Sequence, residues 1–458
     1  MTQSRSLSRR TFLRLAAVGS MGAAIAACVP ATNQPAEGET QEKSPTTEAP
    51  AANKVTLRMW SHQNPSFIGA NEALIAKYIE NNPNVEITYE NFPYADFITN
   101  IQTSMAAQNE ADVMEMFGSW VQPYAKGGTL APVHDLVLGL ETARSLYYDA
   151  PLAGYTWEGE LYGMPNEYNL ENGAVLTNKR MFEEAGISFP VKWNTWEDLV
   201  SDAKKMTKVE NDAMTVAGYH FVNGDGLGFL FWEGILEKGG EYFADDKVHL
   251  DFKSSQAQET VQWMFDLANV DKVVDPMTFN PNSNWVGESF FQGLAAIGFI
   301  GPWIIPEGRR NYPDFADAWD YIATPHFGEK QLFAADAGWG KVVSRNSKAI
   351  AEAWKFSAFC AMDPDNCKQW NVATGTVPAL ITVAEDPDLL TKIDWLAPSL
   401  KVLRNGRFVG MLQDRDYVWY NVLGTRITEC LQKVRSVEET MQLMHDEANA
   451  MIDEKIKS

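Results

Sequence analysis

Strand and helix patterns alternate along residues 54–117, and this alternation limits the fold more than any other feature of the sequence. The segment KVTLRMW at 54–60 alternates polar and apolar side chains as a strand does, and residues 67–81 have the apolar spacing of an amphipathic helix. The pattern continues with a strand at 85–89, a helix at 97–107 and a strand at 111–117. Parallel strands need a helical crossover, so this order predicts a parallel sheet with helices on its faces.

The same alternation recurs along the rest of the chain. We expect helices at 178–186, 195–208, 227–239, 254–269, 283–293, 348–362 and about 434–456, and strands at 214–222, 294–301, 321–325 and 337–345. About 400 residues follow the N-terminal segment, which exceeds what one hydrophobic core comfortably holds, so two lobes are expected. Open sheets of this kind bind ligands outside the carboxyl ends of their strands.

The first 28 residues have the features of an export signal. SRRTFLR at 8–14 is a twin-arginine signature, and a short apolar run follows at 15–27. At about 1.5 Å per residue, this run is too short to cross a hydrocarbon core of about 30 Å. It ends in IAAC at 25–28, which is typical of a lipobox, although an incidental thiol beside an ordinary cleavage site is the alternative. We therefore expect lipidation of Cys28 and attachment to the outer face of a membrane.

Residues 29–53 are poor in apolar side chains and rich in Pro, Thr, Glu and Ala. Such a segment cannot bury enough surface to fold, so we expect a disordered tether and a globular body that starts near residue 54. The net charge of −22 argues against nucleic acid and anionic lipid surfaces as partners. No later apolar run is long enough to cross a bilayer.

The cysteine and histidine patterns predict neither a disulfide framework nor a metal site. Cys360 and Cys367 are about 10 Å apart on a continuous helix, too far for a disulfide unless the chain breaks at Asp363-Pro364. Together with Cys430, they are interpreted as buried thiols. The six histidines are scattered and no CxxC, HxH or HExxH occurs, so no metal or other cofactor is expected.

Tryptophan recurs at strand ends and turns beside glycine or small polar residues. The apolar run LAAIGFI stops at Gly301-Pro302, directly before Trp303. Three other stretches are similar: WSHQN at 60–64, GSW at 118–120 and DAGW at 336–339. Core packing explains any one of these rings, whereas an aromatic-lined pocket is the better explanation of the set.

Residues of these types suit a carbohydrate. An indole packs against the C–H face of a sugar ring, and carboxylates, amides and imidazoles bond its hydroxyl rim without needing a charged ligand. The candidate platforms are Trp60, Trp120, Trp232, Trp285, Trp303 and Trp339. The candidate polar partners and turn residues are His62, Asn64, Ser119, Glu167, Asn169, Asp336 and Gly338.

An enzyme that acts on glycans would also need aromatic rings and a pair of carboxylates. The 60 acidic residues supply many such pairs by chance, so their number does not discriminate. No GxSxG or P-loop occurs, and GDGLG at 224–228 does not match GxGxxG. We expect a protein that is not an enzyme, with a surface-anchored glycan-acting enzyme as the alternative.

Four segments together resemble the extracellular solute-binding proteins of ABC importers, in particular their carbohydrate-binding group. They are GELYGMP at 159–165, TNKRMFEEAGI at 177–187 with NTWEDL at 194–199, ESFFQGLAAIGFIGPW at 288–303, and AWKFSAFCAMDPDNCKQWNVATGTV at 353–377. Leu176 and Thr177 stand where the family usually has Tyr-Tyr, so a ligand contact of those tyrosines is not carried over.

The resemblance implies a two-lobed α/β fold of the periplasmic-binding-protein type II, with a ligand cleft between the lobes. Family organisation places lobe 1 at 54–165 plus 324–361 and lobe 2 at 166–323 plus 362–458. It also implies a monomer that captures a mono- or oligosaccharide by lobe closure and delivers it to the permease subunits of an ABC transporter. A protein of the same fold that binds a peptide or polyamine, or that acts as a sensor or adhesin, is the alternative.

Overall fold

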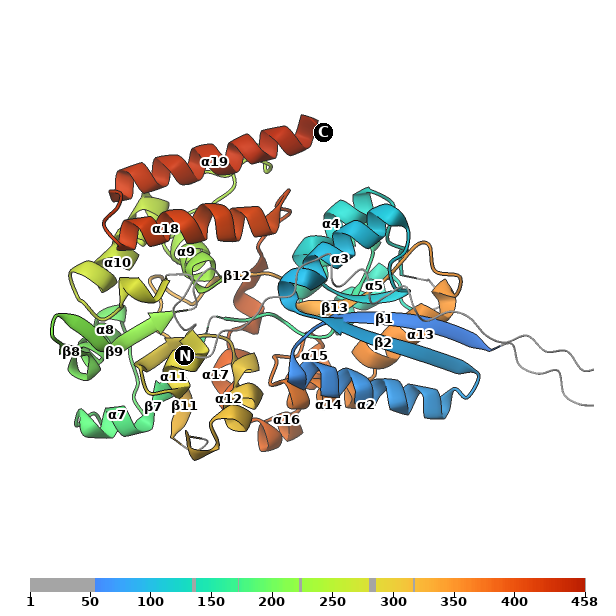
Figure 1. Cartoon of the computed structure of the whole chain (residues 1–458), viewed down its shortest axis with the longest axis horizontal. Coiled ribbons are helices and arrows are strands. Elements are labelled where there is room, and N and C mark those ends of the chain that lie inside the picture. The colour runs from blue at the N-terminus through green and yellow to red at the C-terminus, as the bar shows by residue number, and fades with distance from the viewer. Residues whose placement is uncertain are drawn as a thin grey trace, which may run out of the picture. The chain divides into compact units, whose positions relative to one another are not determined.

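The computed structural model describes residues 54–133, 137–171, 173–221, 225–279, 286–315 and 318–457. Within these residues, two five-stranded sheets each pack against their own helices, which is the expected two-lobed α/β architecture (Figure 1). One cluster of buried apolar side chains surrounds the first sheet and extends into the second lobe, where it includes Leu176, Phe290 and Tyr321, and a second cluster fills the rest of the second lobe.

The sheet of the first lobe is only partly parallel. Its order is β2 (Val85–Phe92), β1 (Val55–His62), β3 (Val113–Phe117), β13 (Trp339–Val343) and β6 (Met164–Pro165). β1 runs parallel to β2 and β3, as predicted, whereas β13 is antiparallel to both β3 and β6. The parallel arrangement predicted for the three strands within 54–117 is therefore confirmed, and β13 and β6 extend this sheet with antiparallel pairing.

Helix caps in the sequence explain where the helices around this sheet begin. Asn64 accepts hydrogen bonds from the N–H groups of Ser66 and Phe67 and so caps α2 (Pro65–Asn81). Asp363 caps α14 (Pro364–Thr374), which directly follows α13 (Ile350–Ala361). The other elements of this lobe are α3 (Tyr94–Ala107), α4 (Gly118–Lys126), α5 (Leu140–Leu146), α6 (Asp149–Gly154), β4 (Thr156–Trp157), β5 (Glu160–Leu161) and α15 (Ile381–Ala384).

The expected lobe boundary at residue 361 is corrected by the packing of α14. Its Trp370 ring lies 4.9 Å from that of Phe67 on α2, edge to face, and Lys77 Nζ donates to Asn366 Oδ1 at 2.6 Å. The segment that follows α13 therefore packs with the first lobe, beside α2, before the chain returns to the second (Figure 1).

The second lobe contains a mixed sheet with the order β11 (Trp319–Ala323), β7 (Ala174–Asn178), β10 (Ala295–Phe299), β9 (Ala213–Phe221) and β8 (Lys208–Glu210). β10 is parallel to β9, while β7 is antiparallel to both of its neighbours. β7 has no counterpart among the predicted strands, because its five residues are all buried and lack the alternation that marks a half-exposed strand.

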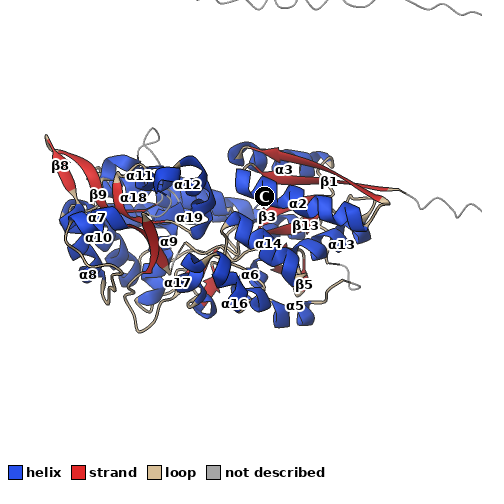
Figure 2. Cartoon of the chain, turned by 90° about the horizontal axis from the view of Figure 1, so that it is seen from below, coloured by secondary structure: helices blue, strands red, loops and turns tan. Residues whose placement is uncertain are grey.

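Helices dominate the second lobe, and Figure 2 shows them in blue around the red strands. α8 (Trp196–Met206) begins at a capping box formed by Thr195 and Asp198. The other helices are α7 (Lys179–Glu184), α9 (Asp225–Glu237), α10 (Ser255–Asn269), η1 (Pro276–Phe279), α11 (Val286–Phe291), η2 (Pro302–Ile304), α12 (Ile305–Asn311), η3 (Pro313–Phe315), the π-helix η6 (Tyr417–Gly424), α18 (Thr425–Leu431) and α19 (Val437–Lys457).

Short elements connect the lobes: β12 (Phe333–Ala335), α16 (Pro387–Lys392), η4 (Asp394–Leu396), α17 (Ala397–Leu400), η5 (Leu403–Asn405) and β14 (Gly406–Phe408). Cys360, Cys367 and Cys430 are buried free thiols, as expected. Among the described residues, we find no helix of sufficient length and apolar character to span a membrane.

Two helical glycines give a matched test of the packing. A Cβ on Gly228 of α9 would lie 2.2 Å from the Trp419 indole nitrogen, whereas one on Gly69 of α2 meets nothing within 4 Å. We expect Gly228→Ala to lower the unfolding free energy by about 1–3 kcal/mol through overpacking. Gly69→Ala should raise it by about 0.5–1 kcal/mol. Urea unfolding measures both, and shifts of the same sign would contradict this packing.

Candidate functional site between the lobes

An aromatic stack lies at the strand ends of the first lobe. The Trp339 ring is 4.1 Å from His62 and 4.1 Å from Phe117, with interplanar angles of 7° and 25°. Two rings cannot lie over the same face at this distance, so they cover opposite faces of the indole. The expectation that Trp339 offers a stacking face to a sugar is corrected, because both of its faces are occupied.

A buried ion pair lies directly beneath this stack. Lys341 Nζ is 2.9 Å from Glu115 Oε1, and the other oxygen of Glu115 lies 3.2 Å from His62 Nδ1. Asn71 bonds both members of the pair: its Nδ2 donates to Glu115 Oε1 at 2.8 Å, and its Oδ1 accepts a hydrogen bond from Lys341 Nζ at 3.1 Å. Burial acts to raise the pKa of Glu115, but Lys341 and His62 outweigh it and lower this pKa to about 2. His62 is thus held by Glu115 and by Trp339.

The first crossover contributes Glu167 and Asn169, which lie against the turn that precedes Trp339. Glu167 Oε1 accepts the backbone N–H of Trp339 at 3.1 Å. Gly338 has φ +87°, and a Cβ there would lie 2.7 Å from the Asn169 nitrogen, so only glycine fits this turn. Burial raises the pKa of Glu167 to about 8, although the hydrogen bond from Trp339 acts in the opposite direction.

Trp303 is half-buried beside the same crossover. Its Nε1 donates to Glu171 Oε1 at 2.8 Å, and the N–H of Gly301 donates to the other Glu171 oxygen. The cavity that Trp303 shares with Glu167 and Asn169 has a volume of about 10 Å³, enough for one water molecule. A sugar can stack on Trp303 only if the lobes move apart, so its role as a platform stays a prediction.

Asp336 is fully buried and pairs with Arg415, whose Nη2 lies 2.5 Å from Asp336 Oδ2. Arg415 also lies 3.0 Å from Asp416 Oδ1. Its guanidinium packs over the rings of Trp419 at 4.2 Å and Phe117 at 5.9 Å. Arg415 therefore joins the second crossover, the second lobe and the aromatic stack of the first lobe. In this conformation Asp336 serves as its partner.

A pocket of about 150 Å³ lies between the lobes. The first lobe lines it with residues of α3 and α4, and the second lobe lines it with residues 412–416 and Lys455. Ser119 Oγ and Trp120 Nε1, whose residues are 3 % and 9 % exposed, have no hydrogen-bond partner here. Buried polar atoms normally find a partner, so Ser119 Oγ and Trp120 Nε1 are two polar groups beside this pocket that remain to be satisfied.

The remaining predicted site residues lie elsewhere or outside the described part of the chain. Trp60 packs against Phe92 and donates to Glu90 Oε2 at 2.8 Å. Asn64 uses its side-chain oxygen to cap α2. Trp232 is fully buried against Tyr242, Phe252 and Trp419, so its expected role as a ligand platform is corrected to core packing. Trp285 and Cys28, the residue at which lipidation is expected, lie outside the described residues.

Sequence reasoning missed three contributors to this region, namely Phe117, Glu171 and Arg415. Phe117 ends a predicted strand immediately before Gly118, which was a usable signal. Arg415 pairs with a residue 79 positions earlier and belongs to no motif, so no local signal marks it. Among the described residues, no cluster of His, Cys, Asp and Glu is arranged to hold a metal ion.

Two α/β lobes joined by crossovers, with a polar and aromatic pocket between them, define a class of binding proteins that enclose a ligand by lobe closure. Comparison with known families is in accord with this class. Residues 64–364 match the family described as bacterial extracellular solute-binding protein, and the chain belongs to this family.

The curated proteins that this chain resembles are distant in sequence. The maltotriose-binding protein of Pyrococcus abyssi is 24% identical over 343 residues, which cover 72% of this chain and 68% of that protein. The arabinooligosaccharide-binding protein of Bacillus subtilis is 25% identical over 288 residues, which cover 61% and 63%.

Solved structures support the fold. A solute-binding protein of Thermotoga lettingae bound to alpha-D-tagatose gives a TM-score of 0.71 at 19% identity, over 87% of this chain and all of that chain. Maltose-bound MalE3 of T. maritima gives a TM-score of 0.71 at 17% identity, with coverage of 87% and 100%. Both are consistent with the periplasmic-binding-protein type II fold.

The ion pair between Lys341 and Glu115 leads to a prediction about how the stability of a Lys341 variant depends on pH. Lys341→Met leaves Glu115 buried opposite an apolar side chain, and we expect a loss of about 3–5 kcal/mol of unfolding free energy at pH 7. The folded-state pKa of Glu115 in the native protein is below its ordinary value of 4.5, so its stabilisation is present above pH 4.5 and is lost as the pH falls towards 2.

The penalty of Lys341→Met should therefore be smaller at pH 4 than at pH 7, because protonation of Glu115 relieves the unpaired charge. Urea unfolding at the two pH values measures the difference. A double variant, Glu115→Gln with Lys341→Met, serves as the control and should recover part of the loss at pH 7. An equal penalty at both pH values would contradict a charged Glu115 in the native protein.

Proposed function

We propose that this protein captures a carbohydrate, a mono- or oligosaccharide, between its two lobes. The observation that carries the proposal is the pair of unpartnered buried groups, Ser119 Oγ and Trp120 Nε1, at the pocket shared by both lobes. A hydroxyl and an indole N–H beside an aromatic ring are complementary to the hydroxyl rim and C–H face of a sugar. Relatives named for maltotriose and arabinooligosaccharide binding support the same ligand class.

The size of the pocket agrees with a ligand of one ring at this position. A cavity of about 150 Å³ accommodates a six-membered ring such as benzene. The cavity beside Trp303 has a volume of only about 10 Å³ in this conformation, so a sugar could reach Trp303 only if the lobes separate. Ligand contacts with both lobes exist only in the closed form, so binding shifts the population towards closure.

The wider setting of the proposal is a lipid-anchored, monomeric receptor of an ABC importer. The twin-arginine signature and the lipobox ending at Cys28 support export and anchoring, and residues 29–53 would act as the tether. The importer permease would then recognise the closed form and receive the sugar. No catalytic step is proposed, because Glu167, which is buried and holds the N–H of Trp339, serves to position a turn.

Two tryptophans with unpartnered indole nitrogens provide a matched test of the binding site. Trp120→Phe removes the N–H at the pocket, and we expect sugar affinity to fall about tenfold, a change of about 1.4 kcal/mol, with little change in the melting temperature of the unliganded protein. Trp232→Phe alters the second-lobe core and should change the melting temperature without changing affinity.

Calorimetric titration with a panel of mono- and oligosaccharides measures both variants. Equal effects of the two substitutions on affinity would contradict a site at Trp120. Binding of a peptide or polyamine by the native protein, without binding of any sugar, would refute the carbohydrate assignment.

The anchoring proposal has its own test. Cys28→Ser removes the thiol that would receive the lipid, and we expect the protein to move from the membrane fraction to the soluble extracytoplasmic fraction. Cell fractionation with immunodetection measures this shift, and Cys430→Ser, which changes a buried thiol of the folded body, is the control. Membrane retention of the Cys28 variant would contradict lipid anchoring at this residue.

A further inference from the structure

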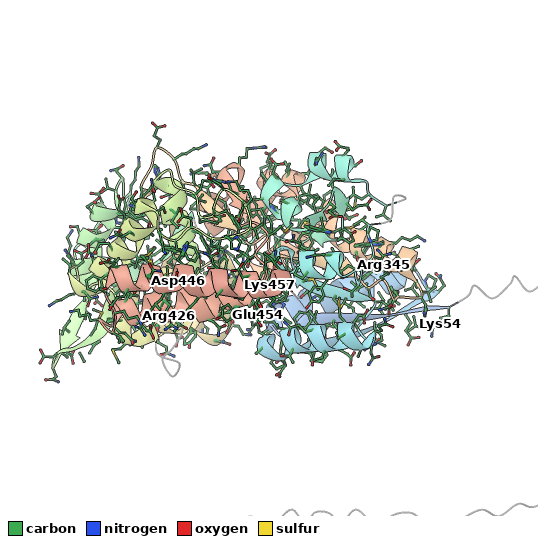
Figure 3. The ribbon with its side chains drawn as sticks, turned by 90° about the horizontal axis from the view of Figure 1, so that it is seen from above. Lys54, Arg345, Arg426, Asp446, Glu454 and Lys457 are labelled. Atoms are coloured by element: carbon green, nitrogen blue, oxygen red, sulfur yellow. The ribbon has the colours of Figure 1, made fainter. Side chains whose placement is uncertain are left out.

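The last helix, α19, is held by one segment of its own lobe on its way to the pocket. Three side chains on one face of α19, at spacings of three and four residues, contact the segment 246–253: Asp446, Asn449 and Asp453. Asn449 bonds both backbone groups of Leu250, at 2.8 and 2.9 Å. Figure 3 shows how α19 runs from Asp446 towards the first lobe.

The end of α19 carries part of the pocket wall, although its side chains are exposed. Ile452 is the last buried residue among those described, and residues 453–457 are exposed. Lys455 lines the pocket between the lobes, where its Nζ lies 3.3 Å from Asp414 Oδ2. The last four carbonyl groups of a helix lack partners within the helix, so its final turn frays unless side chains hold it. The position of this part of the wall therefore depends on contacts made near Asp453.

His249 makes such a contact, because both of its ring nitrogens face carboxylates. Its Nδ1 lies 2.5 Å from Asp246 Oδ2, and its Nε2 lies 3.2 Å from Asp453 Oδ1. A neutral imidazole has one N–H donor, so its other nitrogen would oppose a carboxylate oxygen, whereas an imidazolium donates to both. A cation also interacts favourably with the C-terminal end of a helix dipole. The geometry therefore favours the protonated form of His249.

The surroundings of the ring act in the same direction. Hydrogen bonds with Asp246 and then Asp453 raise the pKa of His249 above its ordinary value of 6.5, and its slight burial opposes them. The other titratable groups of this segment and of the neighbouring stretch of α19 are Asp245, Lys247, Asp251, Lys253, His445, Asp446 and Glu454. None of these described residues is hydrogen-bonded to the ring, and Lys253 lies 3.8 Å from Asp446 instead.

We propose that His249 is a pH-dependent latch that holds the last turns of α19, and with them Lys455, at the wall of the sugar pocket. The inference rests on the proposed function and names a regulation of that same site. Protonated His249 ties Asp453 to the turn that contains Asp246 and keeps the wall in place. Deprotonation removes one of the two donors, so the end of α19 frays more often and sugar affinity falls.

The direction of the pH effect follows from the pKa of His249. A group whose pKa is raised in the folded state contributes stability that is fully present below its ordinary value, here 6.5, and is lost as the pH rises through the raised value. The latch is therefore closed in mildly acidic solution and opens towards alkaline pH.

The first experiment tests the latch without any sugar. The histidine ring resonances of the mature protein are followed by NMR as a function of pH, and His249→Gln identifies the resonance of His249. We expect its pKa to be above 6.5 in the native protein. This pKa should fall in Asp453→Asn, because asparagine keeps an acceptor oxygen but not the charge.

Asp446→Asn is the matched control, since it removes the same charge from the same face of α19. Asp446 precedes Asp453 by seven residues, about 10 Å along the helix axis, and its partner is Lys253. This control should leave the pKa of His249 unchanged.

The second experiment measures the effect of the latch on the pocket. Calorimetric titration with the sugar that binds is carried out at about pH 5.5 and about pH 9. The native protein should bind about threefold to tenfold more tightly at the lower pH. Asp453→Asn should lose most of this difference and Asp446→Asn should keep it. Glu167, whose pKa is about 8, titrates in all three proteins, so the comparison of variants isolates His249.

The possible outcomes separate the two proposals. Failure of every sugar to bind at either pH would refute the proposed function. A pKa of His249 at or below 6.5, or one that Asp453→Asn leaves unchanged, would overturn the latch whether or not a sugar binds. Equal pH dependence of affinity in the native protein and Asp453→Asn would overturn the control of the pocket by His249 while leaving the proposed function intact.

Discussion

The ion pair between Lys341 and Glu115 is the interaction on which the aromatic face of the first lobe depends. The two side chains are directly opposite each other in the β13–β3 ladder and are 1 % and 0 % exposed. A shift of one residue in register would turn Lys341 to the other face and leave Glu115 buried without its partner. The strand that returns from the second lobe can therefore add to the first sheet in only one alignment.

That alignment determines how the crossovers meet the pocket. With β13 in register, Trp339 lies between His62 and Phe117, and its N–H reaches Glu167 on the first crossover. Phe117 directly precedes α4, which carries Ser119 and Trp120, and on its other side it meets Arg415 of the second lobe. One buried charge pair is thus linked through a stack of rings to a pocket that both lobes share.

Sequence patterns predicted much of this fold, and physical reasons explain where they did not. Amphipathic helices such as α2 and α10 were predicted to within about two residues because their apolar spacing is local. β7 and the antiparallel direction of β13 depend on the route of the chain between lobes, which no short window contains. Glycine or small polar residues beside tryptophan indicated rings near strand ends and turns, but not which faces are free: Trp339 is covered, Trp60 packs against Phe92, and Trp120 borders the pocket.

The central claim is that sugar binding brings the two lobes together around this pocket. Pulsed electron paramagnetic resonance measures it most directly, with spin labels on Glu72→Cys of α2 and Gln258→Cys of α10, which are both exposed, while the three cysteines of the folded body are buried. The account predicts that a bound sugar at saturating concentration gives one narrow distance distribution, shorter on average than the distribution without sugar. An unchanged distribution at a sugar concentration that saturates binding would contradict it.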